Sequence, residues 1–168
     1  RNLYLEDEKS KRSLSRKIRE AYYAVIMESK LTKDQILEAY LNTIYMGCGY
    51  GVQTAAQAYF SKDIEDVNIA EAAALASMPQ LPTAYALVYS VSASEITEDT
   101  PNLIVKNGDI AYLWNDAAEG RMHTCLSLMH EQGYITEEEY NEVKDVKIKD
   151  IVNPNLDTLN GVSNYFGD

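Results

Sequence analysis

The fold is decided by the stretch NIAEAAALASMPQLP, residues 68–82, which predicts a short helix with a defined beginning and end. Asn68 is a favoured N-cap residue, and Glu71 follows at the spacing of a capping box. Pro79 and Pro82 end the helix, because proline lacks an amide hydrogen and restricts the residue before it. The alanines in between permit neighbouring helices to approach closely, so we expect this helix to be central.

Helical patterns precede this stretch. Apolar residues recur at three- and four-residue steps over residues 13–29, which predicts a helix with one buried face. Thr32 with Gln35 forms a second capping box, and the helix that it opens ends at the glycine-rich segment 47–51. A further short helix is predicted over residues 52–59.

The pattern weakens after Pro82. Short strands are predicted at Val88–Val91 and at Ile104–Val105, with a polar loop over residues 94–102. The segment between Thr83 and Asn115 is the least regular part of the sequence. Helical periodicity returns after Asn115.

The C-terminal third begins with a helix predicted over residues 117–132, with Gly133 as its stop. A third capping box, Thr136 with Glu139, opens a short charged helix. Residues 151–168 are interpreted as loop or linker. The fold class predicted from these patterns is mostly α.

Composition excludes several classes of protein. The 168 residues are 46% apolar and 24% charged, which is typical of a folded domain that needs no disulfide or metal for its core. Fifteen basic against 26 acidic residues give a net charge of −11, which argues against a nucleic-acid partner. No stretch of about 18 apolar residues is present, so nothing in the sequence predicts a membrane span.

The densest functional signal is a cluster of charged residues that we call the cation cluster: Arg16, Lys17, Arg19 and Glu20. On a helix these residues lie within little more than one turn, so several donors can reach one anion. Phosphate and diphosphate groups need several donors at once, and arginine suits them especially. A solvated helix face with an ordinary ion pair is the alternative interpretation.

Linked motifs resolve this ambiguity. In chain order they are RKIRE at 16–20, KDQILEAYLN at 33–42, YMGCGYGV at 45–52, AAQAYFSK at 55–62 and EAAALASMPQLP at 71–82. Together they resemble the family 51 peptidoglycan glycosyltransferases, the transglycosylase domains of class A penicillin-binding proteins. The resemblance covers residues 13–85 almost without a gap.

The resemblance implies a mostly α, lysozyme-like fold and an enzyme that polymerises lipid II into glycan strands with release of undecaprenyl pyrophosphate. Its partners would be lipid II and the growing glycan chain. Arg16, Lys17 and Arg19 are then expected to bind the pyrophosphate, and Glu20 to act as the second glutamate near the reacting centre. Fixed cations of this kind stabilise the charge that builds on a departing diphosphate.

The motif KDQILEAYLN at 33–42 contributes Lys33, Glu38 and Asn42, which we expect to support the cleft. For Lys33 and Glu38, surface positions on a capped helix are an equally good interpretation. The family's fifth motif survives as GRMHTCLSLM at 120–129, in which one arginine has become Gly120. Arg121 is therefore a weaker candidate for binding pyrophosphate.

Two family motifs are missing from residues 1–168, including the first, which carries the catalytic base. We therefore expect residues 1–150 to be the C-terminal portion of a glycosyltransferase domain that is incomplete at its N-terminus, and to be inactive alone. Residues 151–168 would lead toward a transpeptidase domain. The parent would be anchored by an N-terminal segment and act at the extracytoplasmic face of the bacterial cell membrane.

Two other functions stay open at this point. A lysozyme-like glycan hydrolase also uses paired carboxylates, but it has no need of a central cation cluster. A non-catalytic cell-envelope binding module is favoured by Gly120 and by the irregular middle of the chain.

No cofactor is expected, although the resemblance leaves room for a divalent metal at the pyrophosphate. His123, Cys125 and His130 do not have the spacing of a metal site. Cys48 is interpreted, like Cys125, as a small, half-buried side chain. Three tyrosines stand at core spacing and are interpreted as packing residues: Tyr22, Tyr40 and Tyr59.

Overall fold

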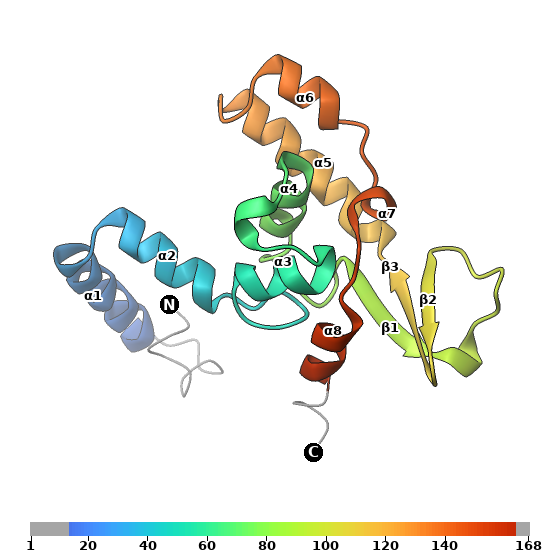
Figure 1. Ribbon diagram of the computed structural model, residues 1–168. Coiled ribbons are helices and arrows are strands. Elements are labelled where there is room, and N and C mark those ends of the chain that lie inside the picture. The colour runs from blue at the N-terminus through green and yellow to red at the C-terminus, as the bar shows by residue number, and fades with distance from the viewer. Residues whose placement is uncertain (1–13, 164–168) are drawn as a thin grey trace. The chain divides into compact units, whose positions relative to one another are not determined.

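A computed structural model describes residues 14–163, with side-chain environments given for residues 14–159. The chain divides into two compact units, residues 1–41 and residues 42–168, and each is described by itself. The described residues form α1 to α8, a three-stranded sheet and two short 3₁₀ turns (Figure 1). The mostly α fold predicted from the sequence is confirmed.

The first unit contains α1 (Leu14–Lys30) and most of α2 (Lys33–Thr43). Both helices begin and end close to the predicted positions. The capping box is present at the start of α2. The Thr32 amide donates to Gln35 Oε1 at 2.9 Å, and the Gln35 amide donates to Thr32 Oγ1 at 3.2 Å.

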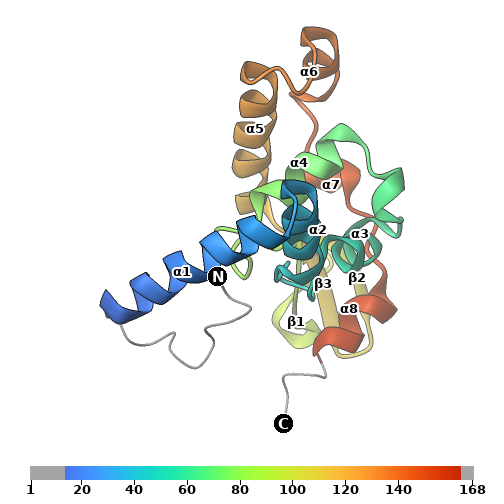
Figure 2. The same ribbon diagram turned by 90° about the vertical axis from the view of Figure 1, so that its left-hand side faces the viewer.

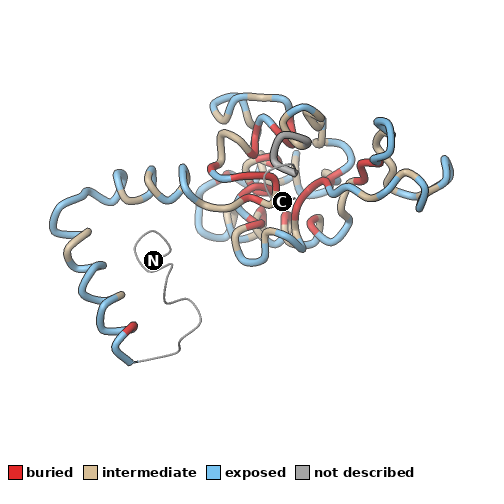
Figure 3. The backbone as a smooth tube through the Cα atoms, turned by 90° about the horizontal axis from the view of Figure 1, so that it is seen from below, coloured by how far each residue is buried: buried red, intermediate tan, exposed pale blue. Residues whose placement is uncertain are grey.

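The predicted buried face of α1 is wrong. Four of its large apolar residues are 62–79% exposed in the structure: Leu14, Ile18, Tyr22 and Val25. Figure 3 shows α1 almost wholly exposed, and Arg16 is the described residue of this helix that is buried. Periodicity identifies an apolar stripe but does not identify what covers it. Tyr40, at 49% exposed, is likewise not a packing residue.

The second unit contains the remaining helices and all three strands. In chain order they are α3 (Val52–Phe60), α4 (Ile69–Ser77), β1 (Val88–Ser92), β2 (Leu103–Asn107), β3 (Ile110–Trp114), α5 (Asp116–Glu131), α6 (Glu137–Val143), α7 (Ile148–Ile151) and α8 (Leu156–Ser163). The 3₁₀ turns are Ile64–Asp66 and Ala93–Glu95.

The core of this unit forms around α4, which packs against α5 (Figure 1). The predicted central helix is therefore confirmed, with both bonds of its capping box. Alanines on α4 let α5 come close, and larger side chains fill the space around them. The largest fully buried side chains are Tyr59, Phe60, Met46, Met78, Leu87, Met122, Leu126 and Ile148. Tyr59 is thus a packing residue, as predicted.

An ion pair ties the end of α3 to α4. Lys62 Nζ lies 2.8 Å and 3.0 Å from the two carboxylate oxygens of Glu71. Glu71 is buried, and one of these oxygens also accepts a hydrogen bond from the Asn68 amide at 2.8 Å. The buried carboxylate is therefore matched by a cation and by a backbone donor, as a buried charge requires.

The irregular middle of the chain is an antiparallel sheet with strand order β1-β3-β2. Both predicted strands are present, at Val88–Ser92 and Leu103–Asn107, but the central strand β3 was not predicted. Its middle residues are buried: Ala111, Tyr112 and Leu113. The strand follows β2 after a turn at Gly108, whose φ is +60°. Such a short apolar run, directly before a helix, shows no alternation that would mark it as a strand.

The C-terminal segment is not simply a loop, because residues 148–151 form α7 and residues 156–163 form α8. The Asn153 and Asn155 amides donate to the carbonyls of Tyr59 and Ala58, both at 2.9 Å. Ser61 Oγ donates to the Asn153 carbonyl at 2.7 Å. These bonds hold the segment along the end of α3, although its expected role as a linker to another domain stays a prediction. Residues 164–168 of that predicted linker lie outside the described part.

Candidate functional site

The cation cluster lies on α1, where Glu20 joins two basic side chains. Arg16 Nε lies 3.6 Å from Glu20 Oε1, and Lys17 Nζ lies 3.0 Å from Glu20 Oε2. The pairs are four and three residues apart, so helix geometry alone brings them together. Two fixed positive charges therefore flank one carboxylate.

The members of the cluster differ in exposure. The side chains of Arg16 and Glu20 are 10% and 16% exposed, whereas that of Lys17 is 57% exposed. Arg19 is also exposed. At 100° per residue, Arg16 and Glu20 lie on the side of α1 opposite the exposed apolar stripe. The arrangement therefore combines a nearly buried ion pair, Arg16 with Glu20, and two exposed cations, Lys17 and Arg19. The exposed cations can meet an anion from solvent.

Arg121 belongs to the second unit, and its side chain binds two residues of that unit. Its Nε donates to the carbonyl of Ser77 at 3.0 Å, and its guanidinium carbon lies 4.7 Å from the centre of the Tyr85 ring. The last carbonyls of a helix have no amide partner in the following turn, and a cation is favoured there. Arg121 thus joins α5 to the end of α4. The neighbouring Gly120 is exposed, and a Cβ added to it would meet nothing within 4 Å.

The residues expected to support a cleft lie at the surface. Lys33 and Glu38 on α2 are exposed, and so is Asn42 near its end. None of these three side chains is buried within the described residues. Their contribution to a cleft stays a prediction.

The glycine-rich loop after α2 is tightly closed. The Met46 amide donates to the Gly49 carbonyl and the Gly51 amide to the Ile44 carbonyl, both at 2.8 Å. Gly47 and Gly51 have φ values of +77° and +87°, which favour glycine. A Cβ on Gly51 would lie 2.9 Å from the Asn42 carbonyl oxygen, so the loop returns directly onto the end of α2.

Cys48 and Tyr59 form the buried side of this loop. Burial raises the pKa of the Cys48 thiol to about 11 and holds the pKa of Tyr59 well above its usual value. The Tyr59 hydroxyl donates to the Met46 carbonyl at 2.9 Å. Both groups are therefore neutral near pH 7 and serve packing. Cys48 is buried and Cys125 half-buried, and both are free thiols.

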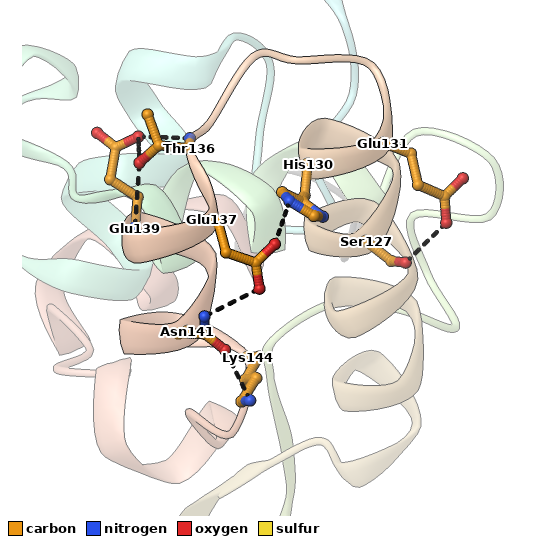
Figure 4. Close-up of polar contacts among 8 residues, drawn as sticks. All are labelled: Ser127, His130, Glu131, Thr136, Glu137, Glu139, Asn141 and Lys144. Atoms are coloured by element: carbon orange, nitrogen blue, oxygen red, sulfur yellow. Dashed lines mark hydrogen bonds and ion pairs between the residues drawn. The ribbon is translucent and has the colours of Figure 1, made fainter.

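The two histidines contact the segments that follow α5. His123 Nε2 lies 2.8 Å from the Val146 carbonyl oxygen. His130 Nε2 lies 2.9 Å from Glu137 Oε2, and its ring stacks on Tyr140 with centres 4.8 Å apart. Figure 2 shows α5 and α6 side by side, and Figure 4 shows the contact between His130 and Glu137 that joins them. Among residues 14–163, no three His, Cys, Asp or Glu side chains gather as metal ligands would.

Sequence reasoning missed Tyr85 and Asn115. Asn115 binds the segment after α4, and Tyr85 lies in that segment and contacts Arg121. Asn115 lies two residues before the helix predicted over residues 117–132, and asparagine near the start of a helix is a signal for an N-cap. Nothing in the pattern around Tyr85 indicates a cation partner on α5, beyond all three strands. None of the helices in the described ranges is both long and apolar enough to cross a membrane.

Comparison with known proteins identifies the class to which this helical domain with its charged first helix belongs. The transglycosylase family matches residues 1–107, more than half of the chain, so the chain belongs to that family. The resemblance found in the motifs is thereby confirmed. The lysozyme-like helical fold expected of the family agrees with the helical architecture described above.

Its relatives include several proteins named penicillin-binding protein 1A. The chain is 37% identical to that of Streptococcus oralis over 163 residues, 96% of this chain and 21% of the relative. It is 35% identical to that of Escherichia coli over 145 residues, which are 86% and 14% of the two chains. With that of Clostridium perfringens it shares 41% identity over 131 residues, 77% and 16%. The chain thus spans only 14–21% of the length of these relatives.

Among solved structures, the chain is similar to penicillin-binding protein 1A from Haemophilus influenzae. The TM-score is 0.49 and the sequence identity is 25%. The match covers 76% of this chain and 16% of that chain.

Proposed function

We propose that this chain is part of a peptidoglycan glycosyltransferase that polymerises lipid II into glycan strands and releases undecaprenyl pyrophosphate. Membership of the transglycosylase family supports this proposal. The observation that carries it is the ionic arrangement on α1, in which Glu20 lies between Arg16 and Lys17.

In the proposed reaction a sugar hydroxyl of the acceptor attacks the anomeric carbon of the growing chain, with inversion. The bond from that carbon to the diphosphate oxygen breaks, and the diphosphate leaves with the electron pair. Its developing negative charge faces Arg16, Lys17 and Arg19, which stabilise it more strongly than they stabilise the intact donor. The hydroxyl proton passes to a carboxylate base, which the family carries in a motif that residues 1–168 do not contain.

Glu20 has two roles in this proposal. It fixes the positions of Arg16 and Lys17 before the diphosphate arrives, so little reorganisation is needed during the reaction. It also lowers the local positive charge, which permits release of the product. Both carboxylate oxygens already face cations, an arrangement that does not suit Glu20 as a metal ligand, and no cofactor is part of the proposal.

The proposed site of action is the extracytoplasmic face of the bacterial cell membrane, because both substrates carry a polyprenyl chain. The parent protein would be anchored there. Residues 1–168 alone are expected to polymerise nothing, since the base is supplied from elsewhere.

The test is polymerisation of lipid II by the full-length parent, followed as glycan length on gels. Glu20→Gln is expected to lower the rate about a hundredfold or more, the loss seen when a group that stabilises transition-state charge is removed. Glu28→Gln is the matched control, because Glu28 is an exposed carboxylate on the same helix. It is expected to leave the rate unchanged.

Three outcomes would contradict the proposal. Turnover by the Glu20→Gln protein at the wild-type rate would remove the role given to this carboxylate. Release of reducing sugars from preformed glycan, without any lipid-linked donor, would identify a hydrolase. A folded parent with neither activity would be a binding module.

A further inference from the structure

The start of α5 holds the segment that follows α4. Two residues carry this contact, Asn115 at the N-cap of α5 and Arg121 in its second turn. Both lie beyond residues 1–107, the part that matches the transglycosylase family.

Asn115 uses its whole side chain. Its amide nitrogen donates to the carbonyls of Ala84 and Ala86 at 2.8 Å and 2.9 Å, and its Oδ1 accepts from the Ala117 amide at 3.0 Å. Its backbone amide also donates to the Leu87 carbonyl at 2.9 Å. Three carbonyls of the segment 84–87 are thus bound by one residue.

Arg121 contacts the same segment through Tyr85. Its Nε holds the Ser77 carbonyl at the end of α4, and its planar guanidinium covers the ring of Tyr85. A guanidinium over a tyrosine ring is attracted by the charge distribution of the ring. Half-buried as it is, Arg121 joins α4, α5 and the segment between Pro79 and Ala86.

That segment in turn presses on the glycine-rich loop. A Cβ on Gly47 would lie 2.9 Å from the Pro82 carbonyl oxygen and 3.0 Å from the Ala86 Cβ. Backbone therefore contacts backbone, and a shift of the segment must move the loop or open a gap beside it. The loop itself returns onto Asn42, a candidate residue of the site.

We infer that Arg121 is a positioning residue: together with Asn115 it holds the segment 79–86, which in turn holds the glycine-rich loop 44–51 beside Asn42. This inference replaces the pyrophosphate contact that the sequence predicted for Arg121. Its catalytic consequence rests on the proposed function, whereas the mechanical link does not.

Amide hydrogen exchange of the 168-residue chain tests the mechanical link. Arg121→Met keeps an unbranched stem and removes both the hydrogen bond and the ring contact. The Met46 and Gly51 amides are expected to exchange about tenfold faster, because the bonds that protect them open more readily when the segment is loose. Lys144→Met is the matched control, an exposed cation on the C-terminal side of α6, and is expected to change neither amide.

Tyr85 provides a second test that does not depend on the folding of the Arg121 variant. Tyr85→Leu removes the ring beneath the guanidinium and is expected to accelerate the same amides, whereas Tyr85→Phe keeps the ring and is expected to preserve them. Unchanged exchange at Met46 and Gly51 in both Arg121→Met and Tyr85→Leu would overturn the inference.

Activity of the full-length parent separates this role from a pyrophosphate contact. If Arg121 is a positioning residue, kcat is expected to fall in Arg121→Met and by a similar factor in Tyr85→Leu, whereas Tyr85→Phe, which keeps the ring, is expected to retain the wild-type kcat. Loss of substrate affinity in Arg121→Met with normal exchange and normal Tyr85 variants would restore the pyrophosphate contact. An inactive wild-type parent would end the proposed function but would leave the exchange result intact.

Discussion

At the scale of single residues, the same change has opposite consequences at two glycines. Gly47 has a φ of +77° and its missing Cβ would lie 2.9 Å from the Pro82 carbonyl oxygen. Gly120 is an exposed position inside α5 with open space around it. Both are simply glycine in the sequence, so backbone angle and surroundings, which the sequence does not state, decide what each one does.

We therefore predict that Gly47→Ala destabilises the chain and that Gly120→Ala stabilises it. The first adds strain at a left-handed backbone together with a close contact and is expected to cost about 1–3 kcal/mol. The second replaces glycine in a helix interior and is expected to add about 0.5–1 kcal/mol. Urea unfolding followed by circular dichroism measures both. Changes of the same sign in the two variants would contradict the prediction.

At the scale of elements, local chemistry explains which parts were predictable. The starts of α2, α4 and α6 follow from capping boxes at Thr32, Asn68 and Thr136, because each box involves residues only three apart. β3 and α8 were missed since they are defined by pairing and packing with distant residues. For the same reason, nothing near Arg121 in the sequence indicates its contact with Tyr85.

The capping box of α6 permits a test of how much one local signal contributes. Thr136 Oγ1 accepts from the Glu139 amide at 3.2 Å, and Glu139 accepts in return from the Thr136 amide at 2.8 Å (Figure 4). Thr136→Ala is expected to cost about 1 kcal/mol in the free energy of unfolding. The control is Thr124→Ala, because Thr124 is an exposed threonine in the middle of α5 and caps no helix.

The same box has a pH dependence with a defined sign. Hydrogen bonds from Thr136 hold the pKa of Glu139 below its usual value. The contribution of the Glu139 carboxylate to the free energy of unfolding is therefore complete above the ordinary carboxyl pKa. It is lost as the pH falls through the lowered pKa. Thr136→Ala keeps the backbone amide and removes the hydroxyl that donates to Glu139 Oε2 at 2.9 Å, so the part of the stability difference that this bond contributes should narrow over that acidic range. A difference that widens toward low pH would contradict the assignment.

At the scale of the whole molecule, the buried hydrophobic core lies within residues 46–148, which are all in the second unit. The cation cluster lies in the first unit, on a helix whose apolar stripe is exposed. The candidate site could be predicted from the sequence because its motif is local. The uncovered stripe could not, since a helical pattern reads the same whether or not another element packs on it.

The contrast between the exposed α1 and the buried core predicts a large difference in amide hydrogen exchange along the 168-residue chain. A single helix of 17 residues is only marginally stable in water without tertiary packing, whereas α4 and α5 are held by the core. Amides in the middle of α1 are expected to exchange at least about a hundredfold faster than those of α4, a difference of ~2.8 kcal/mol in local opening. Equally slow exchange in α1 would mean that its apolar stripe is covered in solution. If the stripe is covered, Ile18→Ser should lower the free energy of unfolding of the chain. If the stripe is uncovered, the same substitution should leave the free energy of unfolding of the core unchanged.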